Sequence, residues 1–378
     1  MIIRGIEDII DKYLFKNKVI LIYGARQVGK TTLCKRILDK YSQTKKTAFF
    51  DCEILDIHKG FETANLDLLK SAIGDKELIV IDEAQLVKDI GKTLKIIHDH
   101  IPHVQAIATS SSSFDLASQT AEPMTGRVFS FVLYPFSVKE IANNNSGFLS
   151  VQSKMEKLLV YGSYPAVFDK SNKDAQDELY SIADNYLYKD ILTFERLRGA
   201  DQILKLLQLL ALQVGNEVSY SEIGQKLAMN HSTVMKYIDL LEKCFVIFKM
   251  RAISRNPRNE ISKSVKIYFY DLGIRNSIIQ SLTPLDLRND TGGLWENFCI
   301  VERRKANQTF GRSVNQYFYR TYNGEEVDLV EEHDGQYDGY EFKYGREHSK
   351  KQKNFLENYP NSAITTISKE NWQNFLLQ

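Results

Sequence analysis

The chain has 378 residues, a length that at roughly 150 residues per domain predicts two or three domains. Its 49 Lys and Arg residues against 48 Asp and Glu residues leave a formal charge of +1, which excludes recruitment of a polyanion by a global field. The four cysteines lie far apart without a C-x-x-C motif, which excludes a zinc finger and a disulfide framework. Charged residues interrupt the N-terminal stretch and the apolar runs are too short for a bilayer, so we expect a cytoplasmic protein without membrane contact.

Short apolar runs alternate with helical patterns from residue 1 to about residue 140. We predict strands at residues 19–23, 47–50, 78–81 and 104–108. This alternation is typical of an α/β domain with a parallel sheet, whose ligand edge is formed by the C-terminal ends of the strands.

A complete G-x-x-x-x-G-K-T motif follows the first predicted strand and leads into a helical pattern. Glycine at both motif positions permits a backbone conformation and a close phosphate approach that a Cβ would block. The loop amides and the helix N-terminus face the phosphates, the lysine reaches the β- and γ-phosphates, and the first threonine ligates Mg²⁺. The predicted nucleotide-binding residues are Gly24, Ala25, Arg26, Gln27, Val28, Gly29, Lys30, Thr31 and Thr32.

Paired carboxylates end the predicted strand at residues 78–81 and support the same site independently. Asp82 is expected to hold Mg²⁺ together with Thr31, directly or through water, and Glu83 to polarise the attacking water. The sequence therefore predicts an ATPase that uses ATP and Mg²⁺.

Two further features are candidates for this site. Residues 109–111 follow the next predicted strand, where a polar side chain is in range of the γ-phosphate, although such Ser/Thr-rich segments also make ordinary turns. Arg127 is a candidate catalytic residue that would supply charge to the transition state, either in cis or from a neighbouring subunit of a homo-oligomer, although most arginines are simply solvated.

Several segments resemble a known family when they are taken in chain order. IYGARQVGKTT, ELIVIDEAQ, the Ser-rich strand end, TGRVFSFVLYPFS and YGSYPAVF are similar to the AAA_14-type prokaryotic AAA-like ATPases, which carry a C-terminal domain of unknown function. The chain departs from the usual family pattern at Ser110 and Ser163, where glycine is more common. The resemblance implies a helical lid after the ATPase domain and a winged helix-turn-helix after the lid.

Residues 201–249 are predicted to form a module of three helices. Ser219 and Glu222 form a capping box, and a second amphipathic helix follows a short turn at residues 228–230. Two short helices joined by a tight turn suggest a winged helix with its wing at residues 245–270. Winged helices also serve as packing or protein-docking modules, so DNA is one possible partner rather than the only one. The candidate basic contacts are Lys236 on the second helix and, near the wing, Lys249, Arg251, Arg255, Arg258, Lys263 and Lys266.

The last hundred residues contain a pattern of carboxylates. A helix, three strands, a helix and a strand are predicted in that order, which resembles the PD-(D/E)XK nuclease fold. Asp328 and Glu341 would bind Mg²⁺, Lys343 would share a strand face with Glu341, and Glu296 stands at the helix position. The pattern by itself is common, and a fold does not establish activity.

We therefore predict an α/β chain with a P-loop ATPase domain at residues 1–145, a helical lid or linker at 146–200, a winged helix at 201–283 and a nuclease-like domain at 284–378. The predicted function is Mg²⁺-dependent ATP hydrolysis coupled to a DNA-associated C-terminal region. Two alternatives stay open, namely a slow ATP-gated DNA-binding switch and an ATP-dependent Mg²⁺ nuclease.

Overall fold

A computed structural model of the chain describes residues 2–62, 64–111, 124–144, 147–185, 200–254, 265–321, 323–345 and 352–377. The predicted DNA contacts Arg255 and Arg258, and Lys263, lie outside these residues. Within them the chain forms two compact units, one built from Ile3–Pro135 and the other from Phe136–Glu242 and Val246–Gln378. The division of the second unit into lid, winged helix and nuclease-like parts stays a prediction.

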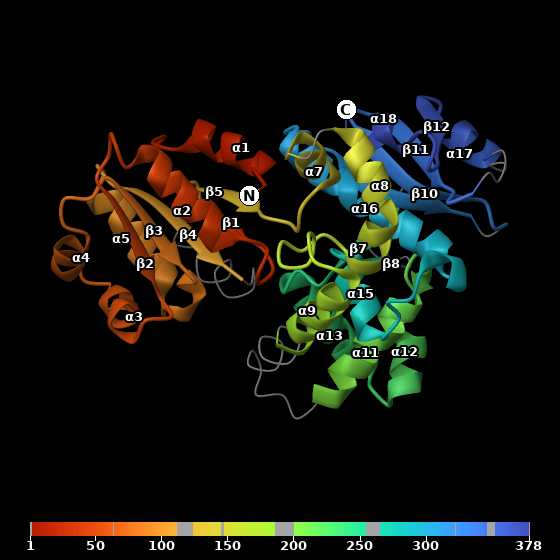
Figure 1. Cartoon of the computed structure of the whole chain (residues 1–378), viewed down its shortest axis with the longest axis horizontal. Helices are drawn as coiled ribbons and strands as arrows, with labels where there is room; N and C mark the ends of the chain where they lie inside the picture. The colour runs from red at the N-terminus through yellow and green to blue at the C-terminus, as the bar shows by residue number, and fades with distance from the viewer. Residues whose placement is uncertain are drawn as a thin grey trace. The chain divides into compact units, whose positions relative to one another are not determined.

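The first unit is a parallel α/β layer, as the sequence predicts, and Figure 1 shows its sheet with helices packed around it. The strands β1 and β3 are buried on both faces, which is why both read as unbroken aliphatic runs. The last strand, β5, is one that the sequence reading did not identify. The elements are α1 (Gly5–Tyr13), β1 (Val19–Tyr23), α2 (Lys30–Tyr41), β2 (Thr47–Asp51), α3 (Leu55–Glu62), α4 (Leu66–Ile73), β3 (Leu78–Asp82), η1 (Ala84–Leu86), α5 (Ile90–His100), β4 (Gln105–Ser110) and β5 (Val128–Val132).

The strand order β2-β3-β4-β1-β5 decides which side chains meet at the ligand edge. Because β4 lies between β1 and β3, its last residues stand between the loop after β1 and the carboxylates after β3. Tyr23 pairs with Ser110 on one side of β4, and Ile81 pairs with Ala108 on the other. The pairing therefore brings Thr109 beside both Asp82 and the phosphate-loop motif.

The second unit contains helices and one mixed sheet of seven strands in the order β12-β11-β10-β9-β7-β8-β6. Figure 1 shows α11–α13 at one end of this unit and β10–β12 with α17 at the other. In chain order, the first elements of this unit are α7 (Val138–Asn144), α8 (Phe148–Tyr161), α9 (Asn172–Asn185), α11 (Ala200–Leu212), β6 (Glu217–Val218), α12 (Tyr220–Leu227) and α13 (His231–Lys243). They are followed by β7 (Ile247–Ala252), β8 (Val265–Phe269), α15 (Leu272–Ile278), η3 (Leu285–Leu287), α16 (Thr291–Thr309), β9 (Asn315–Arg320), β10 (Glu326–His333), β11 (Gln336–Phe342), α17 (Lys353–Asn358), β12 (Ser362–Ile367) and α18 (Trp372–Leu376).

One sheet joins the strands expected for the wing to the strands of the C-terminal region. The link is a parallel pairing between β7 and β9, in which Arg251 faces Tyr317 and Ala252 faces Phe318. The sequence pattern predicts two separate domains for these strands, because hydrophobic periodicity indicates single elements and does not indicate which strands pair. Because of this link, side chains from β8 can reach the carboxylates of α16 and β10.

The turn between α12 and α13 follows from local chemistry. The Ser219 hydroxyl accepts a hydrogen bond from the Glu222 backbone amide at 3.3 Å, as the capping box predicts. Ala228 takes a left-handed conformation with φ +52°, and the Asn230 side chain caps α13 by accepting from the Thr233 amide at 2.7 Å. A Cβ on Gly224 would lie 2.7 Å from the Met229 carbonyl oxygen, so only glycine allows this close approach.

Candidate functional site

Two glycines shape the loop between β1 and α2. Gly24 has φ +155°, and a Cβ there would lie 2.3 Å from the Leu133 carbonyl oxygen at the start of the segment after β5. Gly29 is left-handed with φ +96° and directly precedes α2. The motif glycines are therefore required by this backbone, and the loop ends where the amides of a helix N-terminus are exposed to a ligand.

The Lys30 ammonium lies inside the loop. It donates to the carbonyl oxygens of Gly24 at 2.9 Å and Ala25 at 3.0 Å, and its side chain is only 4% exposed. The Glu83 carboxylate is 3.9 Å from the ammonium. Lys30 is thus held at the loop by two backbone carbonyl oxygens and a more distant carboxylate. A phosphate group that enters the loop can replace these carbonyl oxygens as the partner of the ammonium.

The predicted metal ligands meet directly. The Thr31 hydroxyl donates to one Asp82 oxygen at 2.7 Å, and the Thr109 hydroxyl donates to the other at 2.5 Å. The same Thr109 oxygen accepts from the Glu83 backbone amide at 3.0 Å. Thr109 therefore fixes the Asp82 carboxylate and the Glu83 backbone, so it links the two acidic residues.

Glu83 has partners that the sequence reading missed. Its backbone is left-handed with φ +49°, and its carboxylate accepts a hydrogen bond from the Gln85 side-chain amide. The same amide donates to the Ser111 hydroxyl at 3.0 Å. Gln85 lies two residues after Glu83 in the segment ELIVIDEAQ. Its position directly after the carboxylate pair is the sequence signal that indicates a partner for Glu83.

Arg4 is a second residue without a sequence signal. Its guanidinium donates to the Val28 carbonyl at 2.8 Å and to the Tyr134 carbonyl at 2.5 Å, and it is buried with 7% exposure. It therefore braces the phosphate-loop motif against the segment that follows β5. A lone arginine before an amphipathic helix belongs to no motif, which is why pattern reading passed over it.

The structure does not bring Arg127 to this site. Val19 pairs with Val128 and Tyr23 pairs with Val132, so Arg127 precedes β5 at the sheet edge opposite the loop. At about 3.3 Å per residue the two edges are roughly 15 Å apart. Arg127 pairs instead with Asp99 at 2.9 Å, and this hydrogen bond lowers the pKa of Asp99 to about 2. The expectation that Arg127 acts in cis is corrected for this reason.

The cysteines of this unit take no part in the site. Burial raises the pKa of the Cys52 thiol to about 12, and burial next to Asp82 raises that of Cys34 further above its usual range. All four cysteines are buried and free, as the absence of a disulfide framework predicts.

A second group of charges lies in the other unit around Lys266. This side chain is 1% exposed, and its ammonium is 3.0 Å from Glu296 Oε1 and 2.6 Å from Glu326 Oε1. The Tyr268 hydroxyl donates to the same Glu296 oxygen at 2.6 Å. Burial raises the pKa of Glu296 to about 7, although the Lys266 ammonium acts in the opposite direction.

The other three candidates of the carboxylate pattern lie on β10, on β11 and directly after β11. Asp328 accepts from the Phe342 backbone amide at 2.8 Å, and Lys343 is 3.3 Å from Glu341, so the expected shared face of Glu341 and Lys343 is observed. Burial and the nearby Asp328 raise the pKa of Glu341 to about 7. Burial raises the pKa of Asp328 as well.

One oxygen of this carboxylate group, Glu341 Oε1, is buried without a hydrogen-bond partner among the residues that the structure describes. Across the described residues, no group of three or more His, Cys, Asp or Glu side chains is arranged to hold a metal ion. The expected pair of Mg²⁺ ligands, Asp328 and Glu341, is smaller than such a group and stays a prediction. Lys266, from β8, places a positive charge beside Glu296, the helix carboxylate of the pattern.

The predicted basic surface is also smaller than expected. Lys266 is buried, and Lys249 pairs with Asp239 at 2.5 Å and Glu242 at 2.9 Å, so neither is available to a phosphate backbone. Lys236 on α13 and Arg251 on β7 are exposed. In the described parts of the chain, no helix has the length and apolarity needed to cross a membrane.

Two curated relatives share about a quarter of their residues with this chain. Uncharacterized protein MJ1637 of Methanocaldococcus jannaschii is 26% identical over 315 residues, which cover 72% of this chain and 65% of the relative. Uncharacterized protein Rv2008c of Mycobacterium tuberculosis is 25% identical over 334 residues, which cover 87% of this chain and 71% of the relative. The chain thus spans about two thirds of the length of these relatives.

Solved structures give weaker likenesses. Cdc6p from Pyrobaculum aerophilum is 13% identical with a TM-score of 0.31, covering 75% of this chain and 93% of that one. AMPPCP-bound DnaA from Aquifex aeolicus is 16% identical with a TM-score of 0.26, covering 63% of this chain and 86% of that one. These TM-scores are too low to establish a shared arrangement of the whole chain.

Three family models match in sequence along the chain. Residues 16–142 match the AAA_14 model, an AAA domain, and so include the phosphate-loop motif and the strands β1 to β5. Residues 152–286 match a domain of unknown function, DUF8612, and residues 291–373 match another, DUF4143. The chain thus carries an AAA domain of the AAA_14 type followed by matches to two domains of unknown function, where the sequence resemblance implied one such C-terminal domain.

Proposed function

We propose that this chain binds ATP with Mg²⁺, hydrolyses it, and couples the nucleotide state to a C-terminal region that associates with DNA. The observation that carries the proposal is the continuous hydrogen-bond path from Thr31 through Asp82 to Thr109 and the Glu83 backbone, directly beside Lys30. This path brings the Lys30 ammonium, the Thr31 and Asp82 oxygens and the Glu83 carboxylate together at the loop in which phosphates are expected to bind.

The donor set fits a magnesium ion. Mg²⁺ in nucleotide sites is held by one or two protein oxygens together with substrate phosphates, and the adjacent oxygens of Thr31 and Asp82 are of that kind. When bound, the ion would neutralise charge on the phosphate oxygens. Lys30 then binds the β- and γ-phosphates, and the loop amides orient them. Glu83, restrained by Gln85, orients the attacking water and accepts its proton.

The binding step is tested with Lys30→Ala. Loss of the ammonium should lower ATP affinity roughly 100-fold or more, since charged hydrogen bonds to phosphate are among the strongest in proteins. Calorimetric titration with ATP and Mg²⁺ measures this change. Lys92→Ala is the matched control, because Lys92 is 65% exposed on α5 of the same unit. Unchanged ATP affinity in Lys30→Ala would contradict the proposal.

The chemical step is tested separately with Glu83→Gln. This variant should bind ATP normally and release phosphate roughly 100-fold more slowly, because the amide cannot accept the proton of the water. Glu77→Gln is the matched control, since Glu77 directly precedes the same strand at its other end and contacts Lys45 at 2.8 Å. Phosphate release at the normal rate in Glu83→Gln would assign the base to another group.

The coupling to DNA is supported by the element order α11–β6–α12–α13–β7–β8, with β6 added to β8 as a third strand. This is the order of a winged helix-turn-helix, and the exposed Lys236 and Arg251 lie on α13 and β7. We expect ATP turnover to change when duplex DNA is added at low salt, and a Lys236→Ala, Arg251→Ala double variant to reduce that change.

The slow ATP-gated switch is the alternative to a coupled ATPase, and it has the same site residues. The rate of phosphate release with saturating DNA separates the two, since a switch would keep turning over slowly. The nuclease alternative has less support, because the Glu296 carboxylate of its pattern is already paired with Lys266. Mg²⁺- or Mn²⁺-dependent cutting of DNA that is lost in Asp328→Ala would restore it.

Arg127 keeps one proposed role, as a residue that acts on the nucleotide of a neighbouring subunit in a homo-oligomer. Mixing Arg127→Ala subunits with Lys30→Ala subunits tests it, because only a trans contact would give mixed assemblies a turnover that neither variant has alone.

A further inference from the structure

A pocket with a volume of about 480 Å³ lies on one face of the mixed sheet in the second unit, far along the chain from the phosphate-loop motif. Its floor comes from β9, β10 and β11. One wall is the segment that follows β7, and the other is the segment from Asn358 to Asn361. The volume falls within the range of small-ligand sites, roughly 300–1,000 Å³.

The strand register builds the floor from one carboxylate and two phenol rings. Glu332 on β10 pairs with Tyr337 on β11 and with Asn315 on β9. Tyr317 pairs with Val330, two residues from Glu332, so Tyr317 and Glu332 are diagonal neighbours on the same face. Glu332 therefore lies between two tyrosines that come from different strands.

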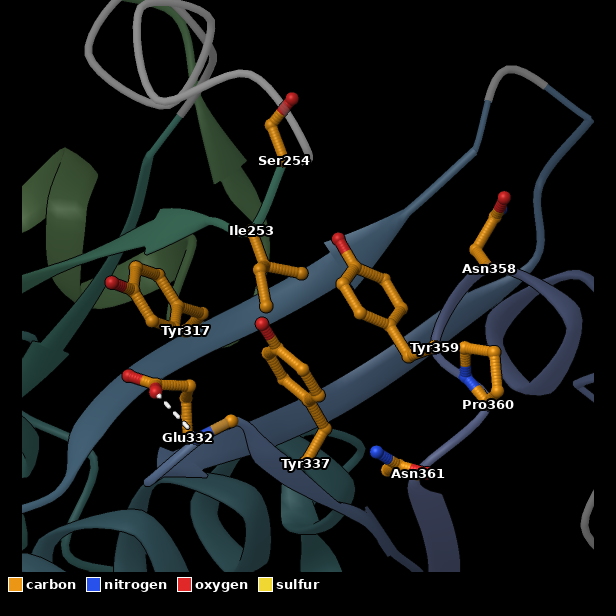
Figure 2. A pocket seen from close by; sticks show the side chains of 10 residues that line it. Ile253, Ser254, Tyr317, Glu332, Tyr337, Asn358, Tyr359, Pro360 and Asn361 are labelled. Atoms are coloured by element: carbon orange, nitrogen blue, oxygen red, sulfur yellow. Dashed lines mark hydrogen bonds between the residues drawn. The ribbon is translucent and has the colours of Figure 1, made fainter.

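A third ring completes the pocket. The Tyr359 ring centroid is 4.7 Å from that of Tyr337, with an angle of 51° between the ring planes. Figure 2 shows Tyr317 and Glu332 at one side of the space, Tyr359 at the other, and Ile253 between them. Tyr359 is held by the core, because its ring also lies 5.2 Å from the ring of Phe355.

The charge of the pocket selects its ligand. The Glu332 carboxylate accepts hydrogen bonds from the neutral Asn315 side chain at 2.7 Å and the Gly335 amide at 3.4 Å. None of the described residues that line the pocket is a lysine or an arginine, and within the described residues no cationic side chain pairs with Glu332. Among the described lining residues, a phosphate would meet one negative charge and no positive one.

We propose that this pocket binds a guanidinium or alkylammonium group, such as the head of an arginine or lysine side chain from a partner polypeptide or a free small amine. Aromatic faces attract such cations through their quadrupole, and a neighbouring carboxylate adds charge attraction. The tyrosines also supply apolar area to the alkyl stem that carries the cation. This assignment is independent of the nucleotide site.

The test uses the full-length protein with N-acetyl-arginine amide as the probe and N-acetyl-citrulline amide as its uncharged isostere. Calorimetric titration should give an affinity for the arginine probe roughly tenfold higher than for citrulline. Agmatine and an arginine-containing peptide form two further arms. Tighter binding of the peptide assigns a polypeptide source, and equal binding assigns a free amine.

Two variants and one control make the test specific to the pocket. Glu332→Gln keeps the shape of the side chain and can accept one of the two hydrogen bonds with its remaining oxygen, and it should lower affinity for the arginine probe roughly tenfold. Tyr337→Leu should lower it severalfold. Asp334→Asn should leave it unchanged, since Asp334 is an exposed residue of the adjoining turn that does not line the pocket. Thermal melting confirms that each variant is folded.

Equal affinity for the arginine and citrulline probes, or unchanged affinity in Glu332→Gln, would overturn the proposal. Binding of a single-stranded oligonucleotide that Tyr337→Leu abolishes, with no binding of the arginine probe, would overturn it as well and assign the rings to base stacking.

Discussion

The two units both place a lysine among carboxylates, yet they use it differently. In the first unit the Lys30 ammonium contacts backbone carbonyls, and its carboxylate neighbour Glu83 is 3.9 Å away. In the second unit the Lys266 ammonium lies 3.0 Å from Glu296 and 2.6 Å from Glu326. In the first arrangement neutral backbone oxygens hold the ammonium, whereas in the second the ammonium is paired directly with two carboxylates.

This difference teaches that a carboxylate pattern alone does not identify a metal site. Buried carboxylates need a compensating charge, and either an ion or a side chain can provide it. For Glu296 the compensating charge is the Lys266 ammonium on β8, and the helix α15 separates β8 from α16 along the chain. The following predictions test this contrast, starting with the largest expected effect.

Lys266→Met should destabilise the second unit by roughly 3–5 kcal/mol, because it leaves Glu296 and Glu326 without their buried partner. Denaturant unfolding at neutral pH measures the change. Lys226→Met is the matched control, since that lysine pairs with Glu222 on an exposed helix surface and should cost about 0.5 kcal/mol or less. A similar loss in the two variants would show that Lys266 is not the charge that holds the cluster.

Asp82→Asn and Asp328→Asn form a pair that separates the two carboxylate sites. Asp82→Asn should slow Mg²⁺-dependent ATP hydrolysis roughly 100-fold, since it removes a charged ligand beside Thr31. Asp328→Asn should change it less than about twofold. Phosphate-release assays across a Mg²⁺ titration measure both rates. Equal effects of the two variants would contradict the assignment of the Mg²⁺ site for ATP to Asp82.

Arg4→Gln should weaken ATP binding by roughly three- to tenfold. Its guanidinium holds the Val28 and Tyr134 carbonyls, and without it the phosphate-loop motif loses a buried brace. Arg36→Gln is the control, because Arg36 pairs with Glu7 at 3.2 Å from a partly exposed position on α2. ATP affinity that stays the same in Arg4→Gln would restrict Arg4 to a purely structural role.

The stability of the second unit should also depend on pH. Glu296 and Glu341 have pKa values of about 7 in the folded chain against about 4.5 as the ordinary value, so the folded state binds more protons between these limits. Stability of the second unit should therefore decrease as pH rises from about 5 to about 7, which a lower melting temperature would show. Glu341→Gln should flatten this dependence, and a rise in stability over the same range would contradict the assigned direction.

Much of the first unit was accessible from sequence. The four predicted strands, the glycine loop and the carboxylates after β3 are all where the pattern put them, because continuous apolar runs and a motif of fixed spacing report local structure. The strand order and pairing could not be predicted from the sequence. The position of β4 beside β3 brings Thr109 to Asp82, and the parallel pairing of β5 with β1 places Arg127 at the opposite edge of the sheet.

The C-terminal region divides in the same way. The order of a helix, three strands, a helix and a strand from residue 291 onward, and the shared face of Glu341 and Lys343, agree with the prediction, whereas the last helix, α18, was not predicted. Lys249 and Lys266 read as solvated basic residues of a wing, but the structure buries or pairs them. The aromatic pocket around Glu332 also had no sequence signal, because its rings come from three separate segments.

Local sequence thus determined which elements form, where the phosphate-loop motif lies and which residue types carry charge, since backbone propensity and hydrophobic periodicity act over a few residues. Only the tertiary structure decided the neighbours of each charge. The free energy of a buried lysine or carboxylate depends on the groups within a few ångströms, and strand pairing brings these groups from distant parts of the chain.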